Sequence, residues 1–492
     1  MLFIRTRESR LVPVVTRMVL RTTTEVTGVV VSAVVEWTRS LNSIMIEGWF
    51  LAAPTYRVHQ SVAANCRRLY MNTRTRSITA TLAVVCALAL TVWLQAAESS
   101  LPTGKPEEVG LSSGRLTRIN ELIQRHIDVG DISGAVTLVA RRGHIAHLEA
   151  HGTTALEGGT PTATDSVFRI ASMTKVITGV AVMMMVEEGK LRVTDPVSLY
   201  IPEFKNLEVA VEHSGRGEGN GDSGSSFDTV LADREVTVRD LLTHTSGLVS
   251  GPISNASERP VAQRPGDTLA DYVPRLGQTV LEFQPGSRWS YSPGAGFQTL
   301  GRIVEIVSGL PLDGFMQERI FDPLGMEDTS FHPTATLASR LVTAYRRTAD
   351  GVELDPDPDR MQRPNFHRAS GGLVSTAEDY VKFGQMLLDG GVWKGERLLS
   401  PRTVEQMAAL HIADTLPGRP VGEGYGLSVR VLSDAVVGGS RLSDGSYGWS
   451  GAFGTHFWVD PRDEIVAILM IQTPISEMRP AFENAVMQAI ID

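Results

Sequence analysis

The sequence predicts a fold of mixed class, in which one antiparallel sheet is combined with many helices. Segments rich in β-branched and aromatic residues lie near both ends of the main body, within residues 134–150 and 424–471. Most segments between them show a helical spacing of apolar residues. We therefore expect an α/β (α+β) fold: strands from both chain ends build one antiparallel sheet, helices flank it, and a large helical region is inserted beside it.

The N-terminal part of the chain differs in charge from the rest. Of the 46 basic and 55 acidic residues in the whole sequence, eleven arginines and four glutamates lie in residues 1–76, so this segment carries +7 and the remainder −16. An acidic main body argues against nucleic acid as a partner. Both cysteines, Cys66 and Cys86, precede residue 98, which leaves the main body without a disulfide framework or a cysteine-based metal site.

Residues 71–97 have the organisation of a secretory signal peptide. A methionine and two arginines precede an apolar segment, residues 78–94, which is followed by small residues at a possible cleavage point. We expect the main body, residues 98–492, to be exported to the periplasm or secreted. The apolar segment could instead remain as a membrane anchor, because its length approaches that of a bilayer span. We interpret residues 1–70 as upstream translation or an N-terminal extension.

The main body begins with a predicted helix and a hairpin. Ser112 or Ser113 can cap a helix that runs to about residue 129. Its apolar residues recur on one face: Leu116, Ile119, Leu122 and Ile123. Two strands, residues 134–140 and 144–150, then surround a turn. Residues 110–114 match G-x-S-x-G, but charged residues rather than a strand precede them, so we interpret them as a capped turn.

Ser172 begins the segment on which the functional prediction depends. An apolar run, residues 176–186, predicts a buried helix that ends near Gly189. Lys175 follows Ser172 by three residues, so the two side chains share one face of this helix. Ser172 lies in the first turn, where backbone N–H groups lack partners, and burial lowers the pKa of a lysine. The arrangement is typical of an activated serine nucleophile; the alternative is a helix cap followed by a solvated lysine.

Two features in the middle of the chain have a simpler interpretation. Residues 219–224 match G-x-G-x-x-G, but no strand precedes them and no helix follows, so we interpret residues 213–226 as a flexible surface loop. His244 ends a short helix that begins at residue 238. The eleven histidines show no paired ligand spacing, so we interpret His244 as a structural residue and expect no metal site.

A turn-rich stretch places Tyr291 just before a helix that we expect over residues 294–307. Side chains on such loops can reach a cleft, and a phenol beside a buried lysine can move a proton to and from a serine. The alternative is an aromatic side chain that packs on its own loop. The remaining segments predict helices over residues 271–281, 315–321, 377–388, 401–410 and 478–491, and strands over residues 424–431, 446–451, 455–459 and 465–471.

Five sequence blocks occur together in the main body. They are FRIASMTK (168–175), LLTHTSGL (241–248), the stretch from 285 to 292 that contains Tyr291, GGLVST (371–376), and GWSGAFGT (448–455) followed by FWVDP (457–461). From about residue 110 to the C-terminus, the chain therefore resembles the β-lactamase-like serine hydrolases, which include class C β-lactamases, D-Ala-D-Ala peptidases and family VIII carboxylesterases. The motifs are most similar to those of the family VIII carboxylesterases.

The resemblance implies a catalytic role for each matched residue. Ser172 is implied as the nucleophile and Lys175 as its proton partner. Tyr291 is implied as the general base that later protonates the leaving group. The backbone N–H groups of Ser172 and Ala452 are implied to form the oxyanion hole.

Substrate recognition is implied to differ from that of β-lactamases. Trp449, Ser450 and Gly451 are implied to bind substrate on the edge strand of the sheet, in the place of K-T-G. A lysine there can attract a substrate carboxylate, whereas an indole cannot form an ion pair. Pro293 stands where β-lactamases often have asparagine, and it offers no side-chain donor or acceptor. With these departures, the resemblance implies hydrolysis of neutral carboxylic esters through an acyl-enzyme, without a cofactor.

Two other functions remain open from the sequence. A β-lactamase or D-Ala-D-Ala peptidase shares the chemistry and differs in substrate. A non-catalytic binding or sensor protein would keep only the fold, although retention of Ser172, Lys175 and Tyr291 together speaks against it. We expect a small-molecule ester as the partner of the protein.

Overall fold

The computed structural model describes residues 15–18, 35–38, 100–212, 227–251, 261–361, 363–412 and 416–492. The chain divides into two units, Met1–Ala89 and Leu90–Asp492. In the first unit, the strands β1 (Val15–Met18) and β2 (Val35–Thr38) pair antiparallel. The predicted signal peptide or anchor, residues 71–97, and the glycine-rich segment 213–226 lie outside the described residues. None of the described helices combines the length and the hydropathy that a membrane crossing requires.

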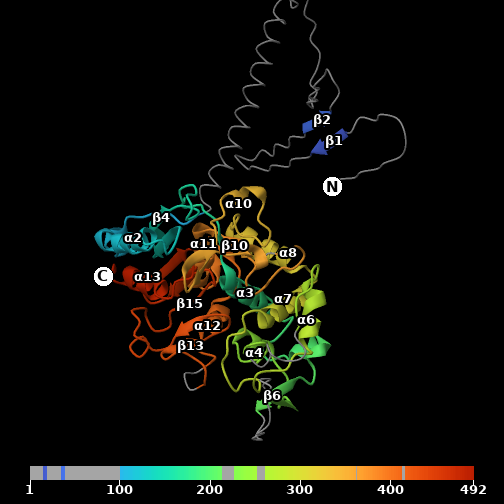
Figure 1. Cartoon of the computed structure of the whole chain (residues 1–492). Coiled ribbons are helices and arrows are strands. Elements are labelled where there is room, and N and C mark those ends of the chain that lie inside the picture. Colours follow the sequence, from blue (N-terminus) through green and yellow to red (C-terminus); the bar gives the residue numbers. More distant parts are fainter. Residues whose placement is uncertain are drawn as a thin grey trace, which may run out of the picture. The chain divides into compact units, whose positions relative to one another are not determined.

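A seven-stranded antiparallel sheet forms the centre of the second unit (Figure 1), in the order β13-β14-β15-β16-β17-β3-β4. Two strands come from the N-terminal side, β3 (Gly134–Arg141) and β4 (His144–Gly152). The other five come from the C-terminal side: β13 (Glu423–Tyr425), β14 (Arg430–Leu432), β15 (Tyr447–Ser450), β16 (His456–Asp460) and β17 (Ile465–Met470). Because β17 pairs with β3 from Ile465 to Met470, the predicted sheet from both chain ends is confirmed.

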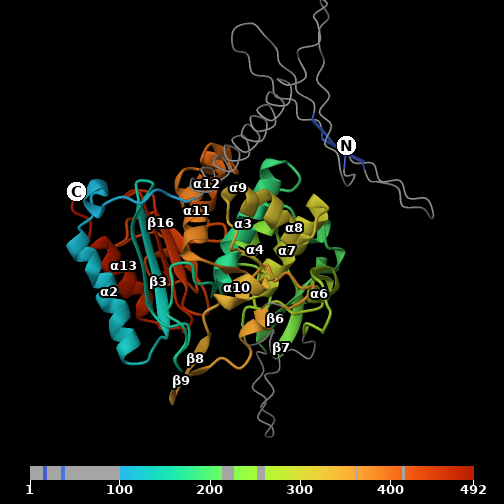
Figure 2. The same cartoon turned by 90° about the horizontal axis from the view of Figure 1, so that it is seen from above.

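Helices cover both faces of this sheet (Figure 2). The helices α2 (Ser113–Asp128) and α13 (Met478–Met487) lie on one face, and α11 (Ala377–Leu388) lies on the other. The side chains of β17 are buried along its whole length, as expected for a strand with apolar layers on both sides. In α2 the four residues predicted for its apolar face are buried, and Ser112 caps the helix by accepting the Arg115 N–H. Residues 110–114 are thus a capped turn, as predicted.

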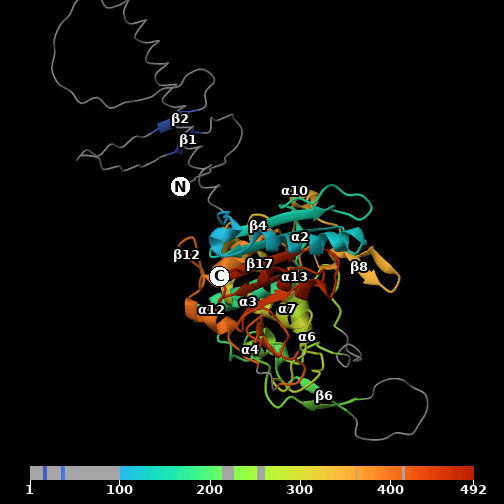
Figure 3. The same ribbon diagram turned by 90° about the vertical axis from the view of Figure 1, so that its left-hand side faces the viewer.

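A helical region packs beside the sheet and is grouped on one side of it in Figures 1 and 3. Its central helix, α7 (Ala295–Ser308), contacts α3 (Thr174–Glu187), α4 (Val238–Leu242), α6 (Leu269–Leu276) and α8 (Leu312–Met316). The helix α3 is apolar around its circumference and buried from Thr174 to Met185, which fixes it between the sheet layer and this region.

Short elements complete the second unit. They are the 3₁₀ turns η1 (Pro106–Val109), η2 (Ala171–Met173), η3 (Val197–Leu199), η4 (Pro202–Phe204) and η6 (Pro358–Met361), the π-helical turn η5 (Gln317–Phe321), the helices α9 (Asp322–Leu324), α10 (Ala335–Ser339) and α12 (Pro401–Ala408), and the strand pairs β5 (Phe168–Arg169) with β10 (Val374–Ser375), β6 (Glu208–Glu212) with β7 (Phe227–Leu231), β8 (Tyr345–Thr348) with β9 (Gly351–Leu354), and β11 (Val392–Trp393) with β12 (Glu396–Arg397).

Two sequence-based expectations about strands were wrong. Residues 424–431 form the hairpin of β13 and β14 rather than one strand, because Ser428 adopts a φ of 71° and Gly426 N–H donates to Val429 O across the turn. The strand that carries Trp449 is also not the edge of the sheet, since β13 and β14 lie outside it. However, β14 pairs only with Tyr447 and Gly448, so among the described strands none pairs on that side with the end of β15 that carries Trp449.

Candidate active site

Ser172 lies at a sharp turn between a short strand and the buried helix α3. The preceding β5 is fixed by antiparallel pairing with β10. Ala171, the first residue of the turn η2, has a φ of 42°, a conformation that residues with a side chain seldom adopt. Because Ala171 is fully buried, packing holds this conformation. The turn therefore presents Ser172 at the leading end of α3, where backbone N–H groups have no helical acceptors.

Lys175 is buried behind Ser172 and has three oxygen neighbours. Its Nζ lies 3.1 Å from Ser172 Oγ, 2.9 Å from Pro293 O and 2.7 Å from Ser370 O. The three neighbours come from three separate segments: the turn before α3, the loop before α7 and the loop before β10. The lysine side chain is thus held in one position by two main-chain carbonyl groups, and it points at the serine hydroxyl.

Burial sets the protonation state of this lysine. Desolvation lowers the pKa of Lys175 well below 10.5, and the nearby charge of Arg368 lowers it further. A neutral amine has two N–H bonds and one lone pair. The carbonyl groups of Pro293 and Ser370 can accept the two N–H bonds, which leaves the lone pair for the proton of Ser172. This geometry can perform general base catalysis.

Tyr291 reaches Ser172 from the loop that precedes α7, a segment distant in the sequence. Its hydroxyl donates to Ser172 Oγ at 2.7 Å, and the Lys175 Nζ lies 5.0 Å from the centre of its ring. Burial raises the pKa of Tyr291 above 10.0. The phenol is therefore favoured over the phenolate, which suits a proton donor better than the initial base that the sequence resemblance implied. The three side chains therefore converge: Lys175 Nζ and the Tyr291 hydroxyl each lie within hydrogen-bonding distance of Ser172 Oγ.

Two backbone N–H groups near Ser172 are available to a ligand. Within the described residues, neither Ser172 N–H nor Ala452 N–H donates to a protein acceptor. The N–H of Gly451, which precedes Ala452, instead donates to Thr455 O at 2.7 Å. Ser172 and Ala452 line the same cavity. Free donors of this kind stabilise an oxyanion, and loss of one typically costs about 2.7–4 kcal/mol of transition-state stabilisation.

The cavity in front of Ser172 has a volume of about 360 Å³ and an aromatic wall. The wall is formed by Trp289, Tyr291, Tyr425 and Trp449, and the rings of Tyr291 and Trp449 are 5.6 Å apart. Ser450 and Gly451 also line it, so all three residues predicted to bind substrate face this space. An aromatic surface of this kind favours apolar groups of a ligand.

Two arginines that line the cavity, Arg430 and Arg479, are paired with glutamates. Arg430 lies 3.1 Å from both Glu423 and Glu483, and Arg479 lies 3.4 Å from Glu423. These arginines are therefore already occupied by carboxylate groups of the protein. No lysine lines the cavity within the described part of the chain.

Ser450 has a proton partner that the sequence did not reveal. Its Oγ lies 2.9 Å from His456 Nδ1, and His456 Nε2 lies 3.1 Å from Glu483. A carboxylate accepts hydrogen bonds only, so the Nε2 of a neutral His456 carries the proton and Nδ1 accepts from the serine. Ser450 thus presents oxygen lone pairs to the cavity. This group was not evident from the sequence because Glu483 lies on α13, 27 residues after His456.

His244, which we interpret as a structural residue, packs behind Tyr291. Its ring lies 4.7 Å from that of Tyr291 and 6.3 Å from that of Trp449, and its Nδ1 accepts the N–H of Ser292 at 3.2 Å. Its Nε2 has no partner in the described structure. Burial keeps the pKa of His244 well below 6.5, so the ring is neutral and fixes the backbone next to Tyr291.

Comparisons with known proteins agree with this fold. The model of the Beta-lactamase family matches residues 119–490. The uncharacterized protein MT1414 of Mycobacterium tuberculosis (strain CDC 1551 / Oshkosh) is 37% identical over 71% of this chain and 88% of its own length. Esterase EstB of Burkholderia gladioli and a putative D-alanyl-D-alanine carboxypeptidase of Salmonella agona (strain SL483) are each 28% identical over 76% of this chain, and 94% and 87% of their lengths are covered.

A solved structure gives the same result. EstCE1, described as a hydrolase with promiscuous acyltransferase activity, superposes with a TM-score of 0.63 at 25% identity, over 76% of this chain and 99% of that protein. The family match spans the sheet, the helical region and every residue of the cavity described above. The chain therefore belongs to the Beta-lactamase family.

Proposed function

We propose that the protein is a serine hydrolase that cleaves neutral carboxylic esters through an acyl-enzyme on Ser172. The observation that carries this proposal is the position of Ser172 Oγ, 3.1 Å from Lys175 Nζ and 2.7 Å from the Tyr291 hydroxyl, at an aromatic cavity. A serine is a weak nucleophile unless a neighbouring group removes its proton. Here the amine has the lowered pKa that such a base needs.

Acylation begins when Lys175 takes the proton of Ser172 as the serine oxygen attacks the ester carbonyl. The negative charge that develops on the carbonyl oxygen is stabilised by the free N–H groups of Ser172 and Ala452. Lys175 becomes an ammonium group, and its three N–H bonds then face Ser172 Oγ, Pro293 O and Ser370 O. Tyr291 donates its proton to the departing alkoxide and is left as a phenolate, while Lys175 keeps the proton taken from Ser172.

In deacylation, water takes the place of serine as the nucleophile. The phenolate of Tyr291 removes a proton from water as it attacks the acyl-enzyme, and the ammonium group of Lys175 gives its proton to Ser172 Oγ when the acid is released. The products are one carboxylic acid and one alcohol. No step requires a metal ion or an organic cofactor.

The neutral substrate class follows from the lining of the cavity. Trp449 offers an indole, and Pro293 presents its carbonyl group to Lys175 rather than to the substrate. Arg430 and Arg479 are paired with glutamates, which reduces their attraction for a substrate carboxylate. Esterase EstB is a relative with this activity in its name, and it supports the same substrate class.

The test is a substrate panel with the purified protein. We expect turnover of p-nitrophenyl acetate and butyrate, and much slower turnover of the β-lactam nitrocefin and of D-Ala-D-Ala peptides. A preference for nitrocefin or for the peptides would assign the protein to the alternative substrate class. Failure of a fluorophosphonate probe to label Ser172 would instead favour a non-catalytic protein of the same fold. The Ser172→Ala variant serves as the control in each assay.

A further inference from the structure

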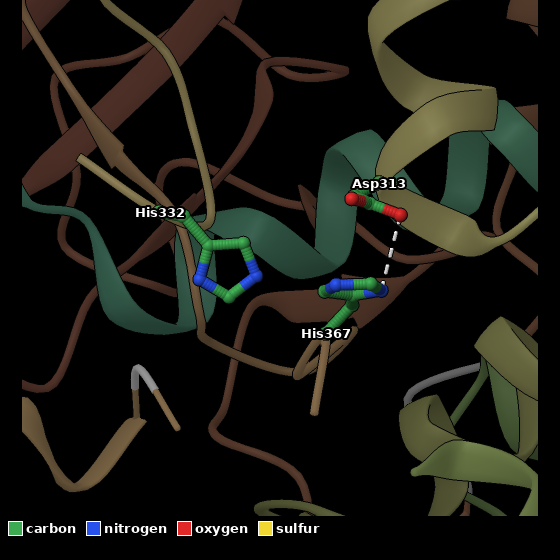
Figure 4. A group of neighbouring side chains, drawn as sticks. All are labelled: Asp313, His332 and His367. Carbon is green, nitrogen blue, oxygen red and sulfur yellow. Dashed lines mark ion pairs between the residues drawn. The ribbon is translucent and has the colours of Figure 1, made fainter. Parts of the chain in front are cut away.

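Three side chains with metal-binding atoms meet at a second place in the structure, outside the cavity. They are Asp313, His332 and His367 (Figure 4), and none of them lines the space in front of Ser172. One ligand atom from each residue lies within 4.8 Å of the other two. His367 Nδ1 is 3.2 Å from Asp313 Oδ1, and the two imidazole rings are 5.1 Å apart. The expectation that the histidines are too scattered for a metal site did not anticipate this convergence.

We propose that this group binds one divalent transition-metal ion and that Zn²⁺ fits it best. Two imidazoles and one carboxylate are ligands that zinc accepts, whereas calcium and magnesium prefer sites built from oxygen atoms alone. Three protein ligands leave a fourth tetrahedral position. Because His332 is exposed, solvent can fill that position and an ion can enter from outside.

The backbone around each ligand is held in place before any ion arrives. Asp313 lies on the short helix α8 between the buried residues Leu312 and Phe315. His332 follows the buried Phe331, whose ring lies 5.6 Å from the ring of His367. The backbone therefore requires little rearrangement, and only the three side chains need to turn towards the ion.

Two further contacts fix the histidine segments. Ser330, two residues before His332, exchanges backbone hydrogen bonds with Val374 at 2.9 and 3.2 Å. His367 follows Phe366, which is buried. Both histidines thus extend from segments that are anchored in the protein, although 34 residues separate them in the sequence.

The charge around the group favours a cation. Within the described residues, Asp313 forms no ion pair with an arginine or a lysine, and its ion-pair partner is His367. The neighbouring Glu305 is paired with Arg302, so these two charges offset each other. With neutral imidazoles, the site carries the one negative charge of Asp313. Binding of the ion replaces the contact between His367 and Asp313 and releases any proton that this pair shares.

The role that follows from the position is structural. The ion would join α8, the segment before His332 and the segment that runs from His367 to Ser370. Ser370 O is one of the two carbonyl groups that hold Lys175. Occupancy should therefore stabilise the folded protein and restrain this loop, while the reaction at Ser172 proceeds without a metal-bound group.

The experiment is a Zn²⁺ titration of the full chain after removal of metal with a chelator. We expect one high-affinity equivalent by calorimetry and a rise in Tm of at least about 2 °C with excess Zn²⁺, because an ion that binds only the folded state stabilises it. His332→Ala removes an exposed ligand, so it should fold normally and lose at least about tenfold in affinity. Asp313→Asn should lose affinity as well.

His144→Ala is the matched control, because His144 is an exposed histidine outside the group. It should bind Zn²⁺ like the parent protein. Circular dichroism of each metal-free variant confirms that the fold is intact before titration. The proposal is overturned if the parent protein shows no Zn²⁺-dependent change in Tm, or if His332→Ala and Asp313→Asn both bind as tightly as the His144→Ala control.

Discussion

Ser172 and Ser450 line the same cavity, and each is hydrogen-bonded to a basic side chain. Ser172 has the amine of Lys175 at 3.1 Å and the phenol of Tyr291 at 2.7 Å. Ser450 has His456 at 2.9 Å, followed by Glu483, an order that matches the serine–histidine–carboxylate arrangement of many hydrolases. By residue type alone, Ser450 has the more familiar set of partners.

The two serines differ in the groups that surround their bases, His456 and Lys175. Glu483 is already paired with Arg430 at 3.1 Å, so less of its negative charge is available to stabilise a protonated His456. Burial lowers the pKa of both His456 and Lys175, so burial by itself does not distinguish the two bases. Protonated Lys175, by contrast, meets two carbonyl oxygens aimed at its Nζ. In the proposed mechanism, the outer partners of a base, and not its type, decide which serine can lose its proton.

The largest effect on activity is expected from removing the hydroxyl group of Ser172, and removal of the Ser450 hydroxyl group is the matched comparison. Ser172→Ala should lower kcat for p-nitrophenyl butyrate on the order of 10⁴-fold or more, because the nucleophile is absent. Ser450→Ala should keep kcat within about tenfold and act mainly on KM, since it loses a contact with substrate. Initial rates of both purified variants check this. Equal losses in both would mean that the comparison between the serines is wrong.

Replacing the base of Ser172 comes next. The guanidinium group stays protonated at every accessible pH, so Lys175→Arg should lose activity on the order of 10³-fold without recovery at high pH. In the parent protein, kcat/KM should fall as pH is lowered through the pKa of Lys175, because the amine becomes protonated. Burial places this fall well below pH 10.5. A pH–rate profile with its midpoint near 10.5 would contradict the role of Lys175 as base.

Removal of the phenol hydroxyl should have a somewhat smaller effect. Tyr291→Phe keeps the ring that packs against His244 and Trp449, so the Tm should change little. Loss of the proton donor should reduce kcat roughly 10²- to 10⁴-fold. The loss should shrink with esters whose leaving group needs no proton, such as p-nitrophenol, relative to alkyl esters. An equal loss for both ester types would remove Tyr291 from the proton-donor role.

The smallest effect on activity is expected at the outer end of the Ser450 group. Glu483→Gln should change kcat only a few-fold but lower the free energy of unfolding by about 1–3 kcal/mol, since Arg430 and His456 lose a charged partner. Burial alone would raise the pKa of Glu483, but His456 and Arg430 hold it below 4.5.

The pH dependence of stability gives this prediction a sign. A carboxylate whose pKa is lowered by folding stabilises the folded state above about pH 4.5 and loses that contribution as pH falls through the lowered pKa. The difference in unfolding free energy between the parent protein and Glu483→Gln should therefore be full near pH 7 and shrink below about pH 4.5. Urea denaturation near pH 7 and below about pH 4.5 measures it; a difference that is independent of pH would show that folding does not lower the pKa of Glu483.

Local patterns in the sequence were sufficient for elements with one continuous signal. The apolar run after Ser172 predicted a buried helix, and α11 occupies the predicted residues 377–388. The hairpin at residues 423–432 was missed because the positive φ of its turn falls on Ser428 rather than on Gly426.

Contacts between distant segments were accessible from the sequence only where the family resemblance supplied them. Ser172, Lys175 and Tyr291 could be assigned in this way. The partners of Ser450, His456 with Glu483, and the group of Asp313, His332 and His367 could not, because each depends on packing that joins segments without a shared motif. The carbonyl partners of Lys175 were missed for a related reason: every residue has a main-chain carbonyl group, so the residue type does not indicate which carbonyl group binds the lysine.

Those carbonyl partners have a consequence for how enzymes of this kind diversify. The amine of Lys175 is anchored by backbone atoms of residues 293 and 370, and backbone atoms persist whatever side chain is present. Position 293 can therefore carry a proline ring in place of an amide side chain while its carbonyl group still holds Lys175. At position 293 the side chain can change while the backbone carbonyl group continues to serve the reaction.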